Sequence, residues 1–496
     1  CARRGRAPRT ARDPGPRPPR WRGRRESAGW SRRNPPRWRW ARRPRARGGP
    51  ASRRRDPAAR RGPASVAAAG LGPGLFEAHA RAGRMPVREL LAPAVAAARE
   101  GFAVRAFEAR LGTIVAPILT ASDSARALFC DAAGRPLAEG ERFANPALAD
   151  VLEVMGHEGP DLVSRGEVAA ALAAACAGEG HLRRADLAAW RPVARTPIQV
   201  ARGDTRLWLN PPPALGGALI AAALALLPRG ADAAAAAQAF AVTALARAMS
   251  RIDEDAAAGR AWLSQAAVVE RLAALTDRPA EVWLAAAADG ARAGLAVRGT
   301  THISAIDHRG NAAALTLSNG TGAGFVVPGT GIMPNNMLGE DDLVPPLPDG
   351  APGRWVPGVR LASMMAPTLM AWPDGRVAAL GSGGSNRIRT ALARVAQRLV
   401  DDARAGAPPD LEAAVAAPRL HVEGVGETTA LDYEREGLAE AEERALLDAW
   451  PGDCRVLGWD RPSMFFGGVH AVARDAAGNP VAAADARRAG HAMTGL

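Results

Sequence analysis

The chain has 496 residues, 48% of them hydrophobic, so it is long enough to bury a large core in two or three domains or in one layered domain. Its net charge of +14 comes from one end, because residues 1–64 hold 23 Arg and three acidic residues (+20), whereas the rest holds 41 basic and 47 acidic residues (−6). The acidic remainder gives no reason to expect a nucleic-acid partner, and no run of about 18 uncharged apolar residues predicts a membrane span.

Residues 1–64 form an Arg- and Pro-rich tail with almost no aliphatic side chains, so the tail is expected not to build a core. We expect it to be disordered or to derive from a shifted reading frame, since stretches such as PRWRWARRPRARGG carry an extreme GC-rich coding bias and the chain begins at Cys1. A nucleic-acid-binding arm is a third interpretation, because Arg interleaved with Trp is typical of such arms.

Residues 65–227 are predicted to be mainly helical. Apolar side chains recur every three or four residues in four segments, 76–82, 87–98, 146–155 and 165–177. The Ala- and Leu-rich stretch Ala214–Leu227 is too short to cross a bilayer and predicts a buried helix. Residues 230–297 are again Ala-rich and predict further helices.

The periodicity changes from helix to strand at Thr300, after which β-branched residues and glycines dominate to about residue 330. Further strands are predicted at Arg376–Leu380 and Met464–Arg474, and helices at Arg387–Asp401 and Leu438–Trp450. A helical half followed by a mixed half indicates an α+β fold, with the chemistry expected at the junction.

The segments TTHISAID and NAAALTLS flank the tripeptide HRG at 308–310. Glycine in the third position of a three-residue loop favours a β-hairpin, because one residue of that loop takes a positive φ. If Asp307 pairs with Asn311, Thr300 lies directly opposite Ser318. Opposed Cβ atoms are about 5 Å apart, so these two hydroxyl groups can interact.

Several short motifs accompany this hairpin. They are GTTHIS (299–304), AREGF (98–102), LAAWRPV (187–193), PPPALGG (211–217), PGTG (328–331) followed by Asn335-Asn336, LASM (361–364), GSGG (381–384), PR (418–419) and FGG (466–468). In type and order they resemble the γ-glutamyltransferases (γ-glutamyltranspeptidases or glutathione hydrolases), a family of N-terminal-nucleophile hydrolases. The resemblance covers residues 65 to about 490.

The resemblance implies a four-layer αββα sandwich and autocatalytic cleavage of the Gly299–Thr300 bond. Residues 65–299 would then form the large-subunit region, mostly helical, and 300–496 the catalytic small subunit. The implied reaction transfers a γ-glutamyl group from glutathione or another γ-glutamyl compound to water or to the amine of an amino acid or peptide. No cofactor or metal is expected.

The resemblance also implies that Thr300 supplies both nucleophile and base, the base being the α-amine that cleavage creates. Since an α-amine has a pKa near 8, it can accept a proton close to neutrality. Ser318, where the family usually has Thr, would hydrogen-bond that amine. Asn319 would help to position the reacting centre.

Backbone N–H groups of Gly383 and Gly384 would stabilise the oxyanion, because glycine lets the main chain approach closely. The α-amine of the substrate calls for carboxylates, which we expect from Glu340 first and then from Asp341. The α-carboxylate of the substrate would bind Ser363.

Two departures leave a related acylase of the same fold open, one that cleaves for instance a cephalosporin or glutaryl side chain. Met337 stands where the family commonly has Gln or Glu, and Ala362 replaces a Ser that would bind the carboxylate. An inactive remnant is the third possibility. The carboxylate-binding Arg of the family's RETAP segment has only a faint counterpart in RESA at 25–28.

His302, Ser304 and Asp307 together suggest a Ser/His/Asp triad, which we do not expect. Asp307 should point to the other face of the strand, because side chains alternate with a period of two, and no G-x-S-x-G motif is present. The other histidines lack metal-ligand spacing and are expected to be structural.

Overall fold

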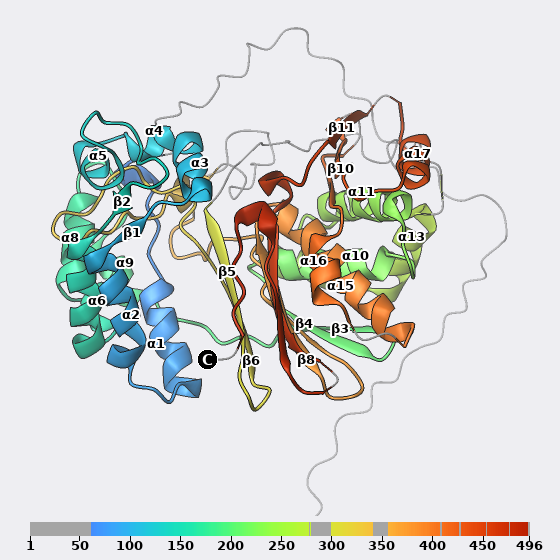
Figure 1. The fold of residues 1–496 in the computed structure, drawn as a ribbon, viewed down its shortest axis with the longest axis horizontal. Helices are drawn as coiled ribbons and strands as arrows, with labels where there is room; N and C mark the ends of the chain where they lie inside the picture. Colours follow the sequence, from blue (N-terminus) through green and yellow to red (C-terminus); the bar gives the residue numbers. More distant parts are fainter. Residues whose placement is uncertain are drawn as a thin grey trace, which may run out of the picture. The chain divides into compact units, whose positions relative to one another are not determined.

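The computed structural model describes residues 61–276, 278, 299–340, 356–406, 409–425, 428–452, 454–475 and 477–494, which lie within one compact unit (Figure 1). The predicted basic tail up to residue 60, part of the helical stretch predicted for 230–297, and Asp341 lie outside the described residues.

The N-terminal part folds mainly into helices, as predicted. Its elements are η2 (Pro63–Ser65), α1 (Leu71–Ala82), α2 (Val87–Glu100), α3 (Ala106–Ile114), α4 (Ala116–Leu119), α5 (Asp123–Phe129), α6 (Pro146–Glu158), α7 (Asp161–Ser164), α8 (Glu167–Ala175) and α9 (Arg184–Ala189), with β1 (Phe102–Ala103) pairing with β2 (Arg142–Phe143). Polar N-caps start two of these helices: the side chains of Ser122 and Asn145 accept backbone N–H groups at the starts of α5 and α6.

A small core joins this helical part to the segment after the hairpin. Leu172 and Leu187 of the helices and Ala323 and Val327 of the later segment are buried in one cluster. The helices therefore pack directly on the chain that follows the hairpin.

Two strands interrupt the stretch predicted to be mainly helical. The prediction of helix was wrong for residues 198–209. β3 (Ile198–Arg202) and β4 (Thr205–Leu209) form an antiparallel hairpin around Gly203, whose φ is +61°. Alternate residues of β4, Leu207 and Leu209 among them, are buried, which is the pattern of a strand with one face on the core.

A six-stranded antiparallel sheet occupies the centre of the fold. Its order is β13-β12-β8-β7-β4-β3, where the further strands are β7 (Thr368–Ala371), β8 (Val377–Gly383), β12 (Gly468–Arg474) and β13 (Pro480–Ala483). Strands from before and after Thr300 therefore hydrogen-bond in one sheet, with β4 next to β7.

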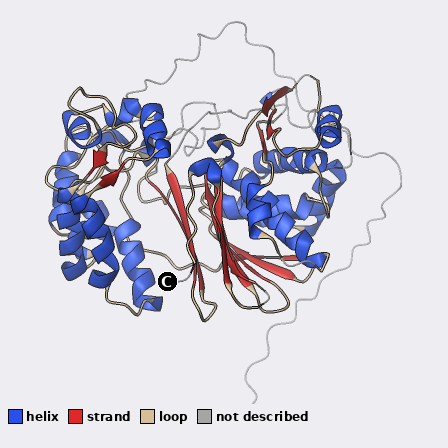
Figure 2. Ribbon diagram, in the orientation of Figure 1, coloured by secondary structure: helices blue, strands red, loops and turns tan. Residues whose placement is uncertain are grey.

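Helices cover one face of this sheet, as Figures 1 and 2 show for α10 and α15. The helices of this part are α10 (Gly216–Leu226), α11 (Ala233–Ser250), α12 (Ala256–Leu263), α13 (Ala266–Thr276), α15 (Arg387–Arg404), α16 (Leu411–Ala416) and α17 (Glu440–Asp448). A small sheet of order β11-β10-β9 lies beside α11 and consists of β9 (Leu420–Glu423), β10 (Ala430–Glu434) and β11 (Arg455–Trp459). The predicted helix at 214–227 is α10 and is buried as expected.

The other face of the sheet carries the hairpin of β5 (Thr300–Ile306) and β6 (Ala312–Ser318), which packs against β8 and β12 (Figure 1). Helices, the large sheet and this hairpin form successive layers, so the predicted α+β class is confirmed. In the described residues the second sheet consists of these two strands. Its outer face is open, since Ile303 is 54% exposed.

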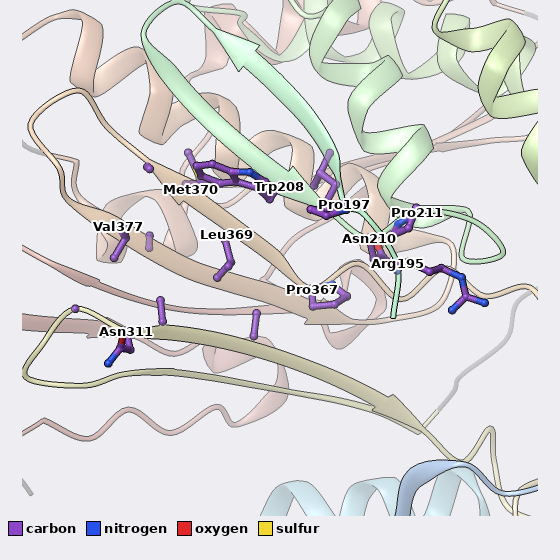
Figure 3. A pocket seen from close by; sticks show the side chains of 16 residues that line it. Arg195, Pro197, Trp208, Asn210, Pro211, Asn311, Pro367, Leu369, Met370 and Val377 are labelled. Carbon is purple, nitrogen blue, oxygen red and sulfur yellow. The ribbon is translucent and has the colours of Figure 1, made fainter. Parts of the chain in front are cut away.

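A mostly apolar groove of about 680 Å³ lies between the turn of this hairpin and strands β4, β7 and β8 (Figure 3). Trp208, Leu369 and Val377 line it from the large sheet and Asn311 from the hairpin turn. Since Asn311 is at the opposite end of the hairpin from Thr300, this groove is separate from the predicted catalytic centre. Among the described residues, no helix combines the length and the apolar character needed to cross a membrane.

Candidate active site

The hairpin has the predicted register. Thr300 pairs with Ser318 and Ile306 with Ala312, and Gly310 has the expected positive φ of +84°. The hydroxyl of Thr300 donates to the hydroxyl of Ser318, with 3.3 Å between the two oxygens. The predicted hydroxyl pair is therefore present at the start of the strand.

The Gly299–Thr300 bond is accessible, and backbone hydrogen bonds hold the residues around it in place. Gly299 is exposed, and its N–H donates to the carbonyl of Gly320 at 2.8 Å. The N–H of Gly320 in turn donates to Ser318 Oγ at 3.2 Å. Ser318 thus accepts from both Thr300 and Gly320, which fixes its side chain beside the hydroxyl of Thr300.

Gly320 cannot carry a side chain in this arrangement. Its φ is +64°, and a Cβ there would lie 2.0 Å from Asn336 Oδ1 and 2.9 Å from Glu340 Oε1. The amide of Asn336 accepts the N–H of Thr321 at 2.8 Å, which holds the turn after β6. Glu340 is buried and its carboxylate lies next to this turn.

The predicted glycine pair lies beside Thr300. Gly383 is the last residue of β8, and a side chain on it would meet the carbonyl oxygen of Thr300 at 2.4 Å. Gly384 has a φ of +128°. Within the described part of the chain its N–H makes no hydrogen bond. A free backbone donor therefore stands next to the strand that carries Thr300.

The loop after this pair leads directly into α15, whose first residue is Arg387. Ser382 Oγ donates to the carbonyl of Gly383 at 2.8 Å and accepts the N–H of Gly468 at 3.3 Å, which ties β8 to β12. The glycine pair consequently lies at the end of one rigid element, the strand β8, and just before another, the helix α15.

His302 is a buried neutral side chain and not part of a triad. Its Nδ1 lies 2.8 Å from Thr316 Oγ1 and its Nε2 lies 2.8 Å from Ser304 Oγ. Burial, and then the charge of His470, lowers the pKa of His302 to about 4. Asp307 instead accepts from the N–H groups of the hairpin turn, so the expectation that no triad forms agrees with the hydrogen bonds.

Two predicted site residues, Asn319 and Ser363, make hydrogen bonds to neighbouring loops and helices. Asn319 follows Ser318, but its amide donates to the carbonyls of Met333 and Pro334, so it braces a loop. Ser363 lies beside the start of α10, where its carbonyl accepts the N–H of Leu215 at 2.7 Å.

Sequence reasoning missed two features here, the brace formed by Asn336 and the position of Arg488. The guanidinium of Arg488 lies beside Gly383 and Gly384. Arg488 is more than 100 positions from the glycine pair in the sequence, and no spacing rule connects them.

The layered sheets and a threonine hydroxyl at the start of a strand beside a glycine pair define the class of N-terminal-nucleophile hydrolases. The chain belongs to the gamma-glutamyltranspeptidase family, whose model matches residues 50–495. It is 32% identical over 403 residues to the acylase ACY 1 proenzyme of Pseudomonas sp. strain SE83, covering 78% of this chain and 68% of that protein. It is 30% identical to the human glutathione hydrolase 5 proenzyme, covering 84% and 75%. The crystal structure of a cephalosporin acylase from Bacillus halodurans has the same fold, with a TM-score of 0.69, 22% identity and coverage of 87% of this chain and 79% of that one.

Proposed function

We propose that the chain is the precursor of a γ-glutamyl amidase and transferase that activates itself by hydrolysis of the Gly299–Thr300 bond. Water would supply the hydroxyl of the new Gly299 carboxylate and a proton for the Thr300 nitrogen, giving a large and a small subunit. The single observation that carries the proposal is the Thr300 hydroxyl, 3.3 Å from that of Ser318, on a residue whose carbonyl oxygen lies against Gly383. The relatives named proenzymes support the cleavage.

The freed amine of Thr300 would take the proton of its own hydroxyl as Oγ1 attacks the amide carbonyl of the substrate. Collapse of the tetrahedral intermediate breaks the C–N bond, and the amine leaves with that proton. Water or a second amine then attacks the ester on Thr300 and releases the acyl group. The free N–H of Gly384, with that of Gly383, is suited to bind the oxyanion.

For the substrate, the human relative named glutathione hydrolase supports a γ-glutamyl donor such as glutathione. In this proposal the carboxylate of Glu340 faces the α-amine of the donor, and Asp341 adds negative charge. Ser363 binds the α-carboxylate. An amino acid or peptide amine, or water, accepts the acyl group.

A second candidate, an acylase for glutaryl-type side chains, is favoured by two apolar positions. Ala362 packs against the hydrophobic core and offers no hydroxyl to a carboxylate. Met337, in the short helix η3 (Met337–Gly339), offers no amide to an α-amine. The bacterial relative named an acylase supports this alternative. Parallel assays with γ-glutamyl-p-nitroanilide and glutaryl-p-nitroanilide separate the two, because the second lacks the α-amine.

The test of the proposal is the substitution Thr300→Ala in the full chain. We expect wild type to give a fragment whose N-terminus reads TTHIS, whereas Thr300→Ala stays intact and loses roughly 10³-fold or more in hydrolysis, since it lacks the nucleophile. Thr300→Ser keeps a hydroxyl and should still cleave. Mass spectrometry of the three proteins decides: an intact wild-type chain contradicts the proposal.

A further inference from the structure

Arg488 borders the space that the glycine pair leaves empty. Arg488 ends the short helix η7 (Ala486–Arg488). Its nearest aliphatic carbons would lie 2.9 Å from a Cβ placed on Gly468. A Cβ placed on Gly383 would lie 3.4 Å from Nη1 of Arg488, and a Cβ placed on Gly384 would lie 3.6 Å from its Nη2. The guanidinium therefore lies against both residues of the pair.

The same Cβ placed on Gly383 would also lie 2.4 Å from the carbonyl oxygen of Thr300. Arg488 thus faces the end of β5 that carries the nucleophile. Both neighbours are glycines, so neither of them carries a side chain that would separate the cation from this space.

Arg488 has no acidic partner among the described residues. Its Nη2 donates to the carbonyl of Met464 at 3.3 Å, whereas its Nε is buried without a hydrogen bond. The preceding Arg487, in contrast, forms salt bridges with Glu434 and Asp485. One of two adjacent arginines forms salt bridges, whereas the other forms none among the described residues and lies beside the glycine pair.

The charged groups around Arg488 leave it protonated. Burial, and then the charge of Arg387 on α15, lowers its pKa to about 10, while Asp485 acts in the opposite direction. At neutral pH the guanidinium therefore carries a full positive charge.

We propose that Arg488 is a positioning residue whose positive charge stands beside the Gly383–Gly384 backbone and stabilises the oxyanion that those N–H groups bind. This inference rests on the function proposed above. The negative charge develops only in the transition state, so the effect falls on kcat and not on the binding of the substrate. No bond to Arg488 forms or breaks.

The test compares Arg488→Met, which keeps the length and removes the charge, with Arg488→Lys, which keeps the charge. Activity is measured on the better of the two p-nitroanilides and normalised to the amount of fragment 300–496. We expect Arg488→Met to lower kcat about 10- to 100-fold, less than the loss of a direct oxyanion donor, with KM within about threefold. Arg488→Lys should recover most of kcat.

Arg474→Met is the matched control. Arg474 also has a buried, unpaired Nε and also donates to a carbonyl, that of His308 at the distal turn of the hairpin. We expect its kcat to stay within about twofold of wild type, because a charge at that end of the sheet does not reach the oxyanion.

An unchanged kcat in Arg488→Met, or a raised KM at constant kcat, overturns the inference. If Arg488→Met is not cleaved, Arg488→Lys decides: cleavage with near-wild-type kcat supports the role of the charge, and failure to cleave overturns it. If wild type itself neither cleaves nor hydrolyses either substrate, the proposed function fails, and this outcome is distinct from active wild type with an equally active Arg488→Met.

Discussion

At the level of single residues, the proposed site uses hydroxyl groups and backbone donors, and the lowered pKa of His302 leaves this histidine neutral near pH 7. His302 stands two residues from Thr300 on the same face of β5, but it is buried and bonded at both ring nitrogens by Thr316 and Ser304. A base would therefore have to come from elsewhere, which agrees with the proposal that Thr300 uses its own amine.

The lowered pKa of His302 makes the stability of the fold depend on pH. The folded-state pKa of His302 is about 4 and the unfolded value is about 6.5, so the unfolded chain binds a proton more readily between these values. The contribution of neutral His302 to the free energy of unfolding is complete above about pH 6.5. It is lost as the pH falls toward 4, by at most about 3 kcal/mol. Urea midpoints measured from pH 7.5 to 4 should fall less steeply in His302→Gln than in wild type.

His421 is the internal control for this experiment. Burial also lowers its pKa to about 4, so its contribution follows the same pH window in both proteins and cancels in the comparison. Parallel curves for wild type and His302→Gln would show that His302 does not carry the effect.

At the level of elements, the ring of His302 links β5, the strand that begins at Thr300, to β8, the strand of the glycine pair. A side chain on Gly381 of β8 would lie 2.2 Å from Cε1 of His302. Gly381→Ala should therefore push β5 away from β8, lower stability by about 1–3 kcal/mol and slow cleavage at Thr300. Thermal unfolding and the yield of the TTHIS fragment measure both effects.

Removal of the ring should relieve that clash. The double variant Gly381→Ala with His302→Ala is expected to be more stable than the sum of the single effects, because the two residues are in contact. Gly452→Ala serves as the control, since a side chain there meets nothing within 4 Å. If the stability changes of Gly381→Ala and His302→Ala simply add in the double variant, the proposed link between β5 and β8 is contradicted.

The hairpin of β5 and β6 was predictable to the residue, because the turn HRG and the alternation of its strands are local signals. The hairpin of β3 and β4 was missed. Its strands have five residues each, and Ala- and Leu-rich segments on either side favour a helix. Short strands of this kind are stabilised by partners that are distant in sequence, here β7 for β4.

The site shows the same division. Thr300 facing Ser318, with Gly383 close by, followed from turn geometry and from the resemblance. The brace formed by the Asn336 amide and the approach of Arg488 depend on side-chain directions and on the packing of β12 and η7, which periodicity does not specify.

At the level of the whole molecule, the proposed cleavage point divides the central sheet between two chains. β3 and β4 precede Thr300, whereas β7, β8, β12 and β13 follow it. Leu209 of β4 pairs with Thr368 of β7, so the two fragments would share one hydrogen-bonded sheet. Further links run from Ala67 to Asn335 through two hydrogen bonds.

The cleaved protein should therefore stay together as one complex. Because α10 and α11 from one fragment and α15 from the other bury a common core on this sheet, separation would expose a large apolar surface and leave β4 and β7 with unpaired edges. We expect both fragments to elute together in equimolar amounts on size exclusion after complete cleavage, and to separate in about 8 M urea, where burial is weakened. A 300–496 fragment that eluted alone in native buffer would mean that the sheet does not join the two halves.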